Sequence, residues 1–90
     1  MAHVHFPRQF LPFTDQNKEH VTEGICIADV LKNLTARFPE LIGPVFSEDL
    51  YPLPFVGLFV NGMPVTTEDE RRAPLETDSQ IVLINAVAGG

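Results

Sequence analysis

The residues of this chain that offer chemistry are few, and the most promising group among them is the carboxylate of Gly90. The sequence ends in Ala86-Val87-Ala88-Gly89-Gly90, a segment without charge and almost without side-chain bulk. Glycine lets a backbone enter a narrow channel and approach another molecule closely. Five extended residues reach roughly 16 Å. We therefore expect residues 86–90 to form a flexible tail that presents the Gly90 carboxylate to a distant active site.

Three histidines suggest a second kind of site, a weak zinc site. His3 and His5 are expected on one face of a strand, and His20 on a second strand that pairs with it. No carboxylate or cysteine completes this set by its spacing. We therefore predict solvated histidines and no metal site.

The single cysteine, Cys26, stands where a helix is expected to begin, a position at which a thiol can become acidic. Its apolar neighbours Ile25 and Ile27 instead predict a partly buried, inert thiol. One cysteine cannot form an internal disulfide. Serine and histidine do not occur at spacings that suggest a nucleophile with its base, and the sequence has no Gly-rich phosphate loop. We predict no catalytic residue.

The charge of the chain indicates which partners suit it. Twelve acidic and six basic residues give a net charge of −6. Such a surface repels phosphate backbones, so nucleic acid is not an expected partner. Basic patches on other proteins suit it better. The run Glu68-Asp69-Glu70-Arg71-Arg72 is expected to be a solvated loop.

A single small domain has to position these groups. Ninety residues bury roughly 60–65% of the surface of the unfolded chain, enough for one core but not for a deep substrate cavity as well. This disfavours a self-contained enzyme. No apolar run approaches the ~20 residues that span a bilayer, and the first residues lack the layout of a signal peptide. We expect a cytoplasmic protein without a membrane partner.

The hydrophobic pattern of the first half predicts a hairpin and a helix. Period-two alternation predicts a strand at Ala2–Phe6. After a polar turn, Glu19–Glu23 is expected to be a second strand that pairs with it as a hairpin. Pro39 ends a predicted helix, whose apolar stripe follows three- and four-residue spacings and comprises Ile27, Val30, Leu31, Leu34 and Phe38. Residues 40–55 are expected to form a long ordered connection with one helical turn near residues 48–51.

The second half predicts further strands. Val56–Val60 is followed by the tight-turn signal Asn61-Gly62 and a short returning strand at residues 63–65. Residues 66–74 are expected to be a surface excursion, and Ile81–Asn85 a final strand. A hairpin, one helix and more strands predict an α+β domain over residues 1–85, with the helix on one face of the sheet.

The same alternation predicts an interface. Ile81 and Leu83 should point inward, as should Leu58 and Val60. The side chains between them should point outward together with Pro64. An exposed patch of this kind is too apolar to be incidental and predicts a partner interface, made of Phe59, Pro64, Val82 and Ile84.

The chain resembles the β-grasp, ubiquitin-like sulfur carriers, which include the small subunit of molybdopterin synthase (MoaD), the thiamin carrier (ThiS) and the carrier of a cysteine synthase (CysO). The resemblance covers essentially the whole chain and is carried by Leu58-Phe59-Val60-Asn61-Gly62, Pro64-Val65, Leu75, Asp78, residues 81–84 and the tail. The tail and the long 40–55 connection are nearest to the cysteine-synthase-associated type. The resemblance implies a β-grasp fold, with a mixed sheet of four or five strands and one main helix packed on one face.

The resemblance also implies a mechanism. An E1-like adenylating enzyme of the MoeB or ThiF type binds the tail, supplies ATP and Mg²⁺, and adenylates the Gly90 carboxylate. A sulfur donor then converts the adenylate to a thiocarboxylate. A sulfur-accepting synthase of the cysteine synthase, ThiG or MoaE type uses that sulfur for cysteine, thiamin, molybdopterin or a related metabolite. The chain itself holds no cofactor and acts as a co-substrate, or as the small subunit of a synthase complex, rather than as an enzyme.

Two alternatives stay open at this point. The same adenylation can lead to an amide bond with a lysine, which would make the chain a ubiquitin-like protein modifier conjugated through Gly90. The chain can also be a non-catalytic interaction subunit whose tail stays docked in a partner. The tail alone does not separate these functions.

Overall fold

The first hairpin, in a computed structural model that describes residues 1–86, pairs β1 (Ala2–His5) with β2 (Glu19–Thr22). The strands are antiparallel, with Val4 opposite His20 and His5 opposite Glu19. Between them lies η1 (Arg8–Phe13), a 3-10 helix that buries Phe10 against the core. The expected pair of strands is confirmed, and the stretch between them is more regular than its two prolines suggest.

Helix α1 (Ile27–Arg37) buries the predicted apolar stripe against the sheet. Asp29 lies in its first turn and Arg37 in its last, an order that suits the helix dipole. The chain enters α1 through Gly24, where an added Cβ would stand 2.5 Å from Val30 Cγ2. Only glycine permits this close approach of the loop to the helix. The 3-10 helix η2 (Pro39–Leu41) follows directly and begins at the proline that ends α1.

The connection from residue 42 to residue 55 contains no helix. The helical turn expected near residues 48–51 is wrong, because Leu50 adopts a φ of 64°, which a right-handed helix cannot contain. The connection is nevertheless ordered by its apolar side chains. Phe46 is fully buried, and Leu50 and Leu53 pack against the core.

Strand β3 (Val56–Val60) and the short β4 (Met63–Pro64) form a second hairpin. Asn61 and Gly62 have φ values of 49° and 86°, which is the pattern of a type I′ turn and the reason for an Asn-Gly pair here. After β4, the expected surface excursion contains a helix, α2 (Glu68–Arg72). The loop predicted for this charged run is therefore wrong.

A capping box explains α2. The Thr67 hydroxyl accepts a hydrogen bond from the Glu70 N–H at 3.1 Å, and the Glu70 carboxylate accepts one from the Thr67 N–H at 3.0 Å. Two backbone donors that a helix start leaves without partners are satisfied in this way. Hydrogen bonds from the N–H of Thr66, at 2.9 Å, and then from the N–H of Thr67 hold the pKa of the Glu70 carboxyl below its ordinary value of 4.5.

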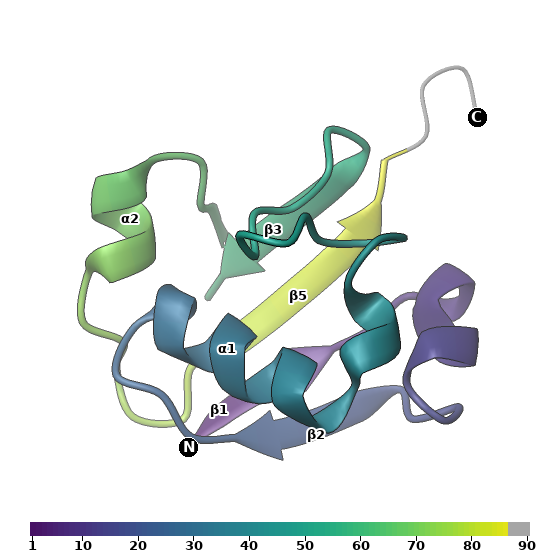
Figure 1. Ribbon diagram of the computed structural model, residues 1–90. Coiled ribbons are helices and arrows are strands. Elements are labelled where there is room, and N and C mark those ends of the chain that lie inside the picture. The colour runs from purple at the N-terminus through teal and green to yellow at the C-terminus, as the bar shows by residue number, and fades with distance from the viewer. Residues whose placement is uncertain (87–90) are drawn as a thin grey trace.

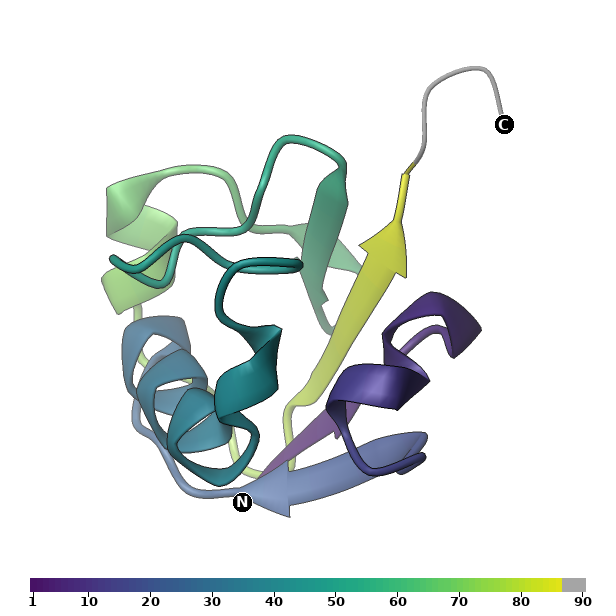
Figure 2. The same cartoon turned by 45° about the vertical axis from the view of Figure 1, so that its right-hand side comes forward.

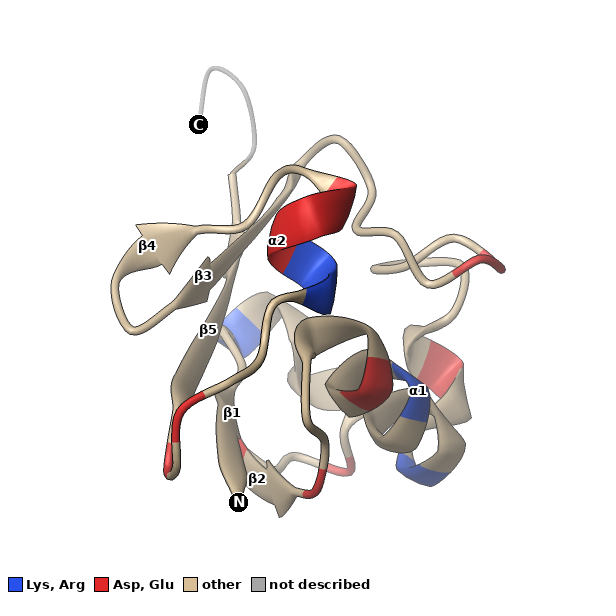
Figure 3. Ribbon diagram, turned by 90° about the vertical axis from the view of Figure 1, so that its left-hand side faces the viewer, with Lys and Arg blue, Asp and Glu red and all other residues tan. Residues whose placement is uncertain are grey.

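The strands form one mixed sheet in the order β2-β1-β5-β3-β4. β5 (Gln80–Asn85) lies at its centre, parallel to β1 and antiparallel to β3 (Figures 1 and 2). Figure 3 shows the sheet from its edge, with α1, α2 and the connection on the same side. The expected α+β class, with the main helix on one face, is confirmed. In the described part of the chain, no helix has the length and apolar character needed to cross a membrane.

Candidate functional site

The predicted reactive residue, Gly90, lies outside the described residues, as do Val87, Ala88 and Gly89. The structure does describe the point from which the tail leaves. The chain leaves the sheet at the end of β5 (Figure 1), which is Asn85. The N–H of Ala86 donates to the carbonyl oxygen of Phe55 at 2.6 Å. Phe55 immediately precedes β3. The first residue of the predicted tail, Ala86, is therefore held at the end of the sheet where β3 begins and β5 ends.

The four residues of the predicted interface share one face of the sheet. Val82 stands opposite Phe59, and Phe59 opposite Pro64. Ile84 follows Val82 by two residues and therefore points the same way. Pro64 and Ile84 are exposed, and the other two are half-buried. The structure thus brings the four side chains together on the face that α1 does not cover, and their role in binding a partner stays a prediction.

The opposite side of the same strands is buried. Leu58, Ile81 and Leu83 are at most 4% exposed. Val60 is partly buried and packs against this core. The predicted alternation of inward and outward side chains is therefore confirmed for β3 and β5, and the register that places Phe59 and Ile84 outside is the one that the core requires.

Gly57 is a residue of this face that the sequence reasoning did not single out. It stands opposite Ile84 in the pairing of β3 with β5. Because Gly57 has no side chain, the side chain of Ile84 occupies the space above it, next to the Phe59 ring. The sequence does carry a signal for this close approach, which is a lone glycine within a predicted strand.

His3 and His5 point to the same outer face, as expected, but His20 does not join them. The His20 ring packs edge-on against Phe38 of the core layer, with ring centroids 5.0 Å apart. Burial, together with the nearby positive charge of Arg37, lowers the pKa of His20 below its ordinary value of 6.5. Within residues 1–86, no three His, Cys, Asp or Glu side chains are placed to hold a metal ion.

Cys26 is the N-cap residue of α1 and is half-buried, as its apolar neighbours predict. Its side chain makes no capping hydrogen bond. The thiol therefore lies at the start of the helix, and its position alone gives it no chemical role.

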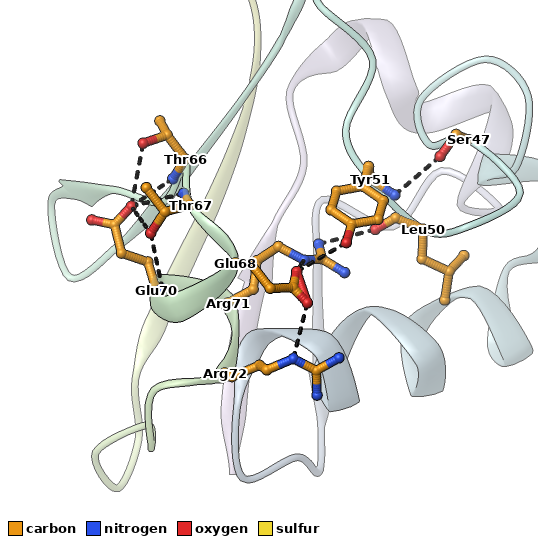
Figure 4. Close-up of polar contacts among 9 residues, drawn as sticks. All are labelled: Ser47, Leu50, Tyr51, Thr66, Thr67, Glu68, Glu70, Arg71 and Arg72. Carbon is orange, nitrogen blue, oxygen red and sulfur yellow. Dashed lines mark hydrogen bonds and ion pairs between the residues drawn. The ribbon is translucent and has the colours of Figure 1, made fainter.

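A polar cluster joins α2 to the connection (Figure 4). Arg71 is only 7% exposed, which corrects the expectation that the whole charged run is solvated. Its Nη1 donates to the carbonyl oxygen of Leu50 at 3.1 Å, and its Nε to Glu68 at 3.2 Å. The guanidinium carbon lies 4.1 Å from the centre of the Tyr51 ring. Leu50, whose carbonyl oxygen accepts this bond, has a left-handed φ of 64°.

Glu68 collects the remaining contacts of the cluster. It accepts hydrogen bonds from the Tyr51 hydroxyl at 2.9 Å and from Arg72 Nε at 2.9 Å. The Tyr51 bond, aided by Arg72 and Arg71, holds the pKa of Glu68 below its ordinary value of 4.5. This ionised carboxylate ties two parts of the chain together, and the whole cluster has a structural role.

A hollow of about 260 Å³ lies beside this cluster, between the connection and β3. Two prolines, Tyr51, Thr66 and Arg71 contribute to its wall. Its described lining holds no carboxylate, histidine or cysteine, so it offers neither a general base nor a metal ligand. The outer sheet face and the root of the tail remain the best candidate site.

Comparisons with known proteins agree with this fold. One chain of the Amycolatopsis orientalis BexX/CysO complex superposes with a TM-score of 0.84 at 19% identity, and 100% of both chains is covered. Small archaeal modifier protein 1 of Methanosarcina acetivorans gives 0.80 at 22% identity, covering 99% of this chain and 95% of that one. Mycobacterium tuberculosis CysO gives 0.75 at 21%, covering 97% and 100%. A search of curated proteins finds no match.

At these identities the structural matches establish the fold, which is the expected β-grasp, ubiquitin-like fold. The family comes from the sequence, because the model of the ThiS family matches residues 4–90. This match spans both hairpins, α1, β5 and the tail. The chain therefore belongs to the ThiS family.

Proposed function

We propose that this protein is a sulfur carrier that is charged at Gly90. An E1-like enzyme brings ATP, and the Gly90 carboxylate attacks the α-phosphate, so that pyrophosphate leaves and an acyl adenylate forms. A sulfur donor then attacks the acyl carbon, AMP leaves, and a thiocarboxylate remains at Gly90. That thiocarboxylate donates its sulfur in the biosynthesis of cysteine, thiamin, molybdopterin or a related metabolite.

One observation carries this proposal beyond family membership. β5 bears Val82 and Ile84 on the open face and leads directly into Ala86, which is held against Phe55. A partner that binds this face therefore meets the root of the tail at a defined place. Recognition and delivery of the carboxylate are then performed by one strand.

The division of labour follows from what the chain contains. Its described residues offer no base, nucleophile or metal site next to the tail root, so the adenylating enzyme supplies ATP and Mg²⁺. The chain contributes its docking face and the acyl group. A second partner, a sulfur-accepting synthase, then has to recognise the same carrier after it is charged.

Sulfur transfer to Gly90 can be tested directly. The protein is incubated with the E1-like enzyme of its own organism, ATP, Mg²⁺ and a sulfide source, and its intact mass is measured. We expect the mass change of one oxygen replaced by sulfur. A variant that lacks Gly90 should not change. Sulfur uptake by the truncated variant would refute the proposal.

The docking face can be tested with a matched pair of variants. Ile84 and Ile42 are both 38% exposed, but Ile42 lies in the connection, away from the open face of the sheet. We expect Ile84→Glu to weaken binding to the adenylating enzyme and Ile42→Glu to leave it unchanged. Equal losses of affinity in the two variants would show that the open sheet face is not the docking site.

A protein modifier is the second candidate function. The likeness to small archaeal modifier protein 1 favours it, since the same adenylate can react with a lysine amine instead of with sulfur. Tryptic digests of cells that express the protein would then contain lysines that carry residues 73–90 of this chain, because Arg72 is its last tryptic site. If neither sulfur nor a conjugate appears at Gly90, the chain is an interaction subunit.

A further inference from the structure

One row of side chains crosses all five strands on the open face of the sheet. The register places Glu19 beside His5, His5 beside Val82, Val82 beside Phe59, and Phe59 beside Pro64. The row is apolar from Val82 to Pro64 and polar from His5 to Glu19. The candidate docking face therefore continues, without a break, into a region of histidines and carboxylates.

The polar region is a connected cluster. His3 lies between two carboxylates, with Nδ1 3.4 Å from Glu19 and Nε2 3.5 Å from Asp78. His5 Nε2 lies 2.6 Å from the amide oxygen of Gln80, and its Nδ1 lies 3.9 Å from Glu19. We call His3, His5, Glu19 and Asp78 the histidine–carboxylate cluster. The amino group of Met1 is also near it, 3.9 Å from Asp78.

These contacts depend on protons. A neutral imidazole donates from one ring nitrogen only, whereas an imidazolium donates from both. His3 faces a carboxylate at each nitrogen, so only its charged form satisfies both contacts. Likewise, when His5 donates to the Gln80 amide oxygen from Nε2, its Nδ1 carries a proton towards Glu19, 3.9 Å away, only in the imidazolium form. The four side chains of the cluster thus sum to zero charge when both rings are protonated and to −2 when both are neutral.

We propose that the open sheet face is a two-part docking surface, on which basic side chains of the adenylating partner bind Glu19 and Asp78 in place of the protons of His3 and His5. The apolar part takes apolar partner side chains. The polar part takes lysine or arginine and becomes more receptive as the pH rises. This inference rests on the proposed function, because it assigns the partner's chemistry.

Charge complementarity favours a basic partner. The side chains of Glu19 and Asp78 are 48% and 69% exposed, so a partner can reach both. No lysine or arginine is paired with either of them among the described residues. Histidine side chains in general change charge between pH 5 and 8, so the competition is tested across that range. His20 lies on the other side of the sheet and takes no part.

The proton linkage is tested by measuring the Kd for the E1-like enzyme at pH 5.5 and pH 7.5. We expect the wild-type protein to bind more tightly at pH 7.5, by about two- to fivefold for each histidine. The double variant His3→Gln, His5→Gln should lose this pH dependence, because glutamine carries no titrating proton. Calorimetry in buffers of different ionisation enthalpy should show proton release on binding only for the wild type.

A second variant keeps the test independent of how the glutamine variant folds. Glu19→Gln with Asp78→Asn removes both charges with little change in shape, and asparagine suits the φ of 58° at position 78. It should bind weakly at both pH values. An unchanged ratio of the two Kd values in both double variants would overturn the inference. If the inference fails in this way, Gly90 still accepts sulfur at saturating enzyme. If the proposed function fails, Gly90 accepts no sulfur, so the two failures can be told apart.

Discussion

Ile84 lies directly over the Cα atom of Gly57. A Cβ added at Gly57 would stand 2.6 Å from Ile84 Cγ1, 2.9 Å from Ile84 Cδ1 and 3.2 Å from Phe59 Cε2. Real side chains do not approach this closely, so any larger residue at position 57 has to move Ile84. The flat apolar part of the open face therefore exists because of a missing side chain.

This contact predicts the effect of Gly57→Ala. The methyl group should force Ile84 to another rotamer and lower the free energy of unfolding by about 1 kcal/mol. It should also weaken binding to the adenylating enzyme, because the shape of the docking face changes. Thermal denaturation and a binding titration measure the two effects.

Gly43→Ala is the control for that experiment. Gly43 has a φ of 109°, and a Cβ there would meet nothing within 4 Å. Backbone strain should therefore cost about 1–2 kcal/mol without touching the open face. If this variant loses as much affinity as Gly57→Ala, general destabilisation rather than the position of Ile84 explains both losses.

His20 predicts how stability depends on pH. Burial against Phe38, with a contribution from Arg37, lowers its pKa in the folded state, so the folded protein favours the neutral ring. The stabilising contribution is present above the ordinary pKa of 6.5 and is lost as the pH falls through the lowered value. In an NMR titration, the His20 ring should have a midpoint below 6.5.

The His20→Gln variant isolates this contribution in unfolding experiments. Its free energy of unfolding should fall less between pH 7 and pH 5 than that of the wild type. His3 and His5 are present in both proteins, so their contributions cancel in the comparison. A wild type and a variant with parallel pH profiles would contradict the assignment.

Arg71 and Arg72 are adjacent in sequence but should differ in importance. Arg71 is buried, bonded to the Leu50 carbonyl and stacked on Tyr51, whereas the Arg72 side chain is 70% exposed. We expect Arg71→Met to lower the free energy of unfolding by about 2 kcal/mol. Arg72→Met should change it little, because exposed ion pairs contribute weakly. Urea denaturation of the two variants makes the comparison, and equal losses would show that the burial of Arg71 does not matter.

The capping box predicts the behaviour of Thr67→Ala. This variant loses the acceptor of the Glu70 N–H and should be destabilised by about 1 kcal/mol. Thr66→Ala is its control, since Thr66 contacts the same carboxylate but does not cap the helix. Amide hydrogen exchange of α2 should quicken in the first variant only. Equal exchange in the two would mean that the Thr67 cap does not hold the helix.

Features that arise from short-range periodicity were the ones best predicted from the sequence. Alternation in β3 and β5 was sufficient to place Phe59 and Ile84 outside and Leu83 inside, because a strand has no other way to bury one face. The same holds for the stripe of α1. These features also placed the four residues of the predicted interface on one face, and their role in binding stays a prediction.

Features that depend on three-dimensional neighbours were missed. The burial of Arg71 needs a carbonyl from Leu50, which is 21 residues away, and nothing in the charged run indicates that partner. Thr67 and Glu70 do carry the capping-box signal at the required spacing, so the helix that they begin was predictable. The row from Glu19 to Pro64 depends on β1 lying beside β5, an adjacency that no local pattern specifies.

The central place of β5 has a consequence for the synthesis of the protein. β1 and β3 are synthesised before β5, and each has an unpaired edge until that strand is placed between them. Ile81 and Leu83 complete the core at the same moment. We expect a chain that stalls before residue 80 to remain unfolded and open to proteases, because it lacks this strand. Cells should accordingly contain few folded molecules of this protein that lack the attachment point of the tail.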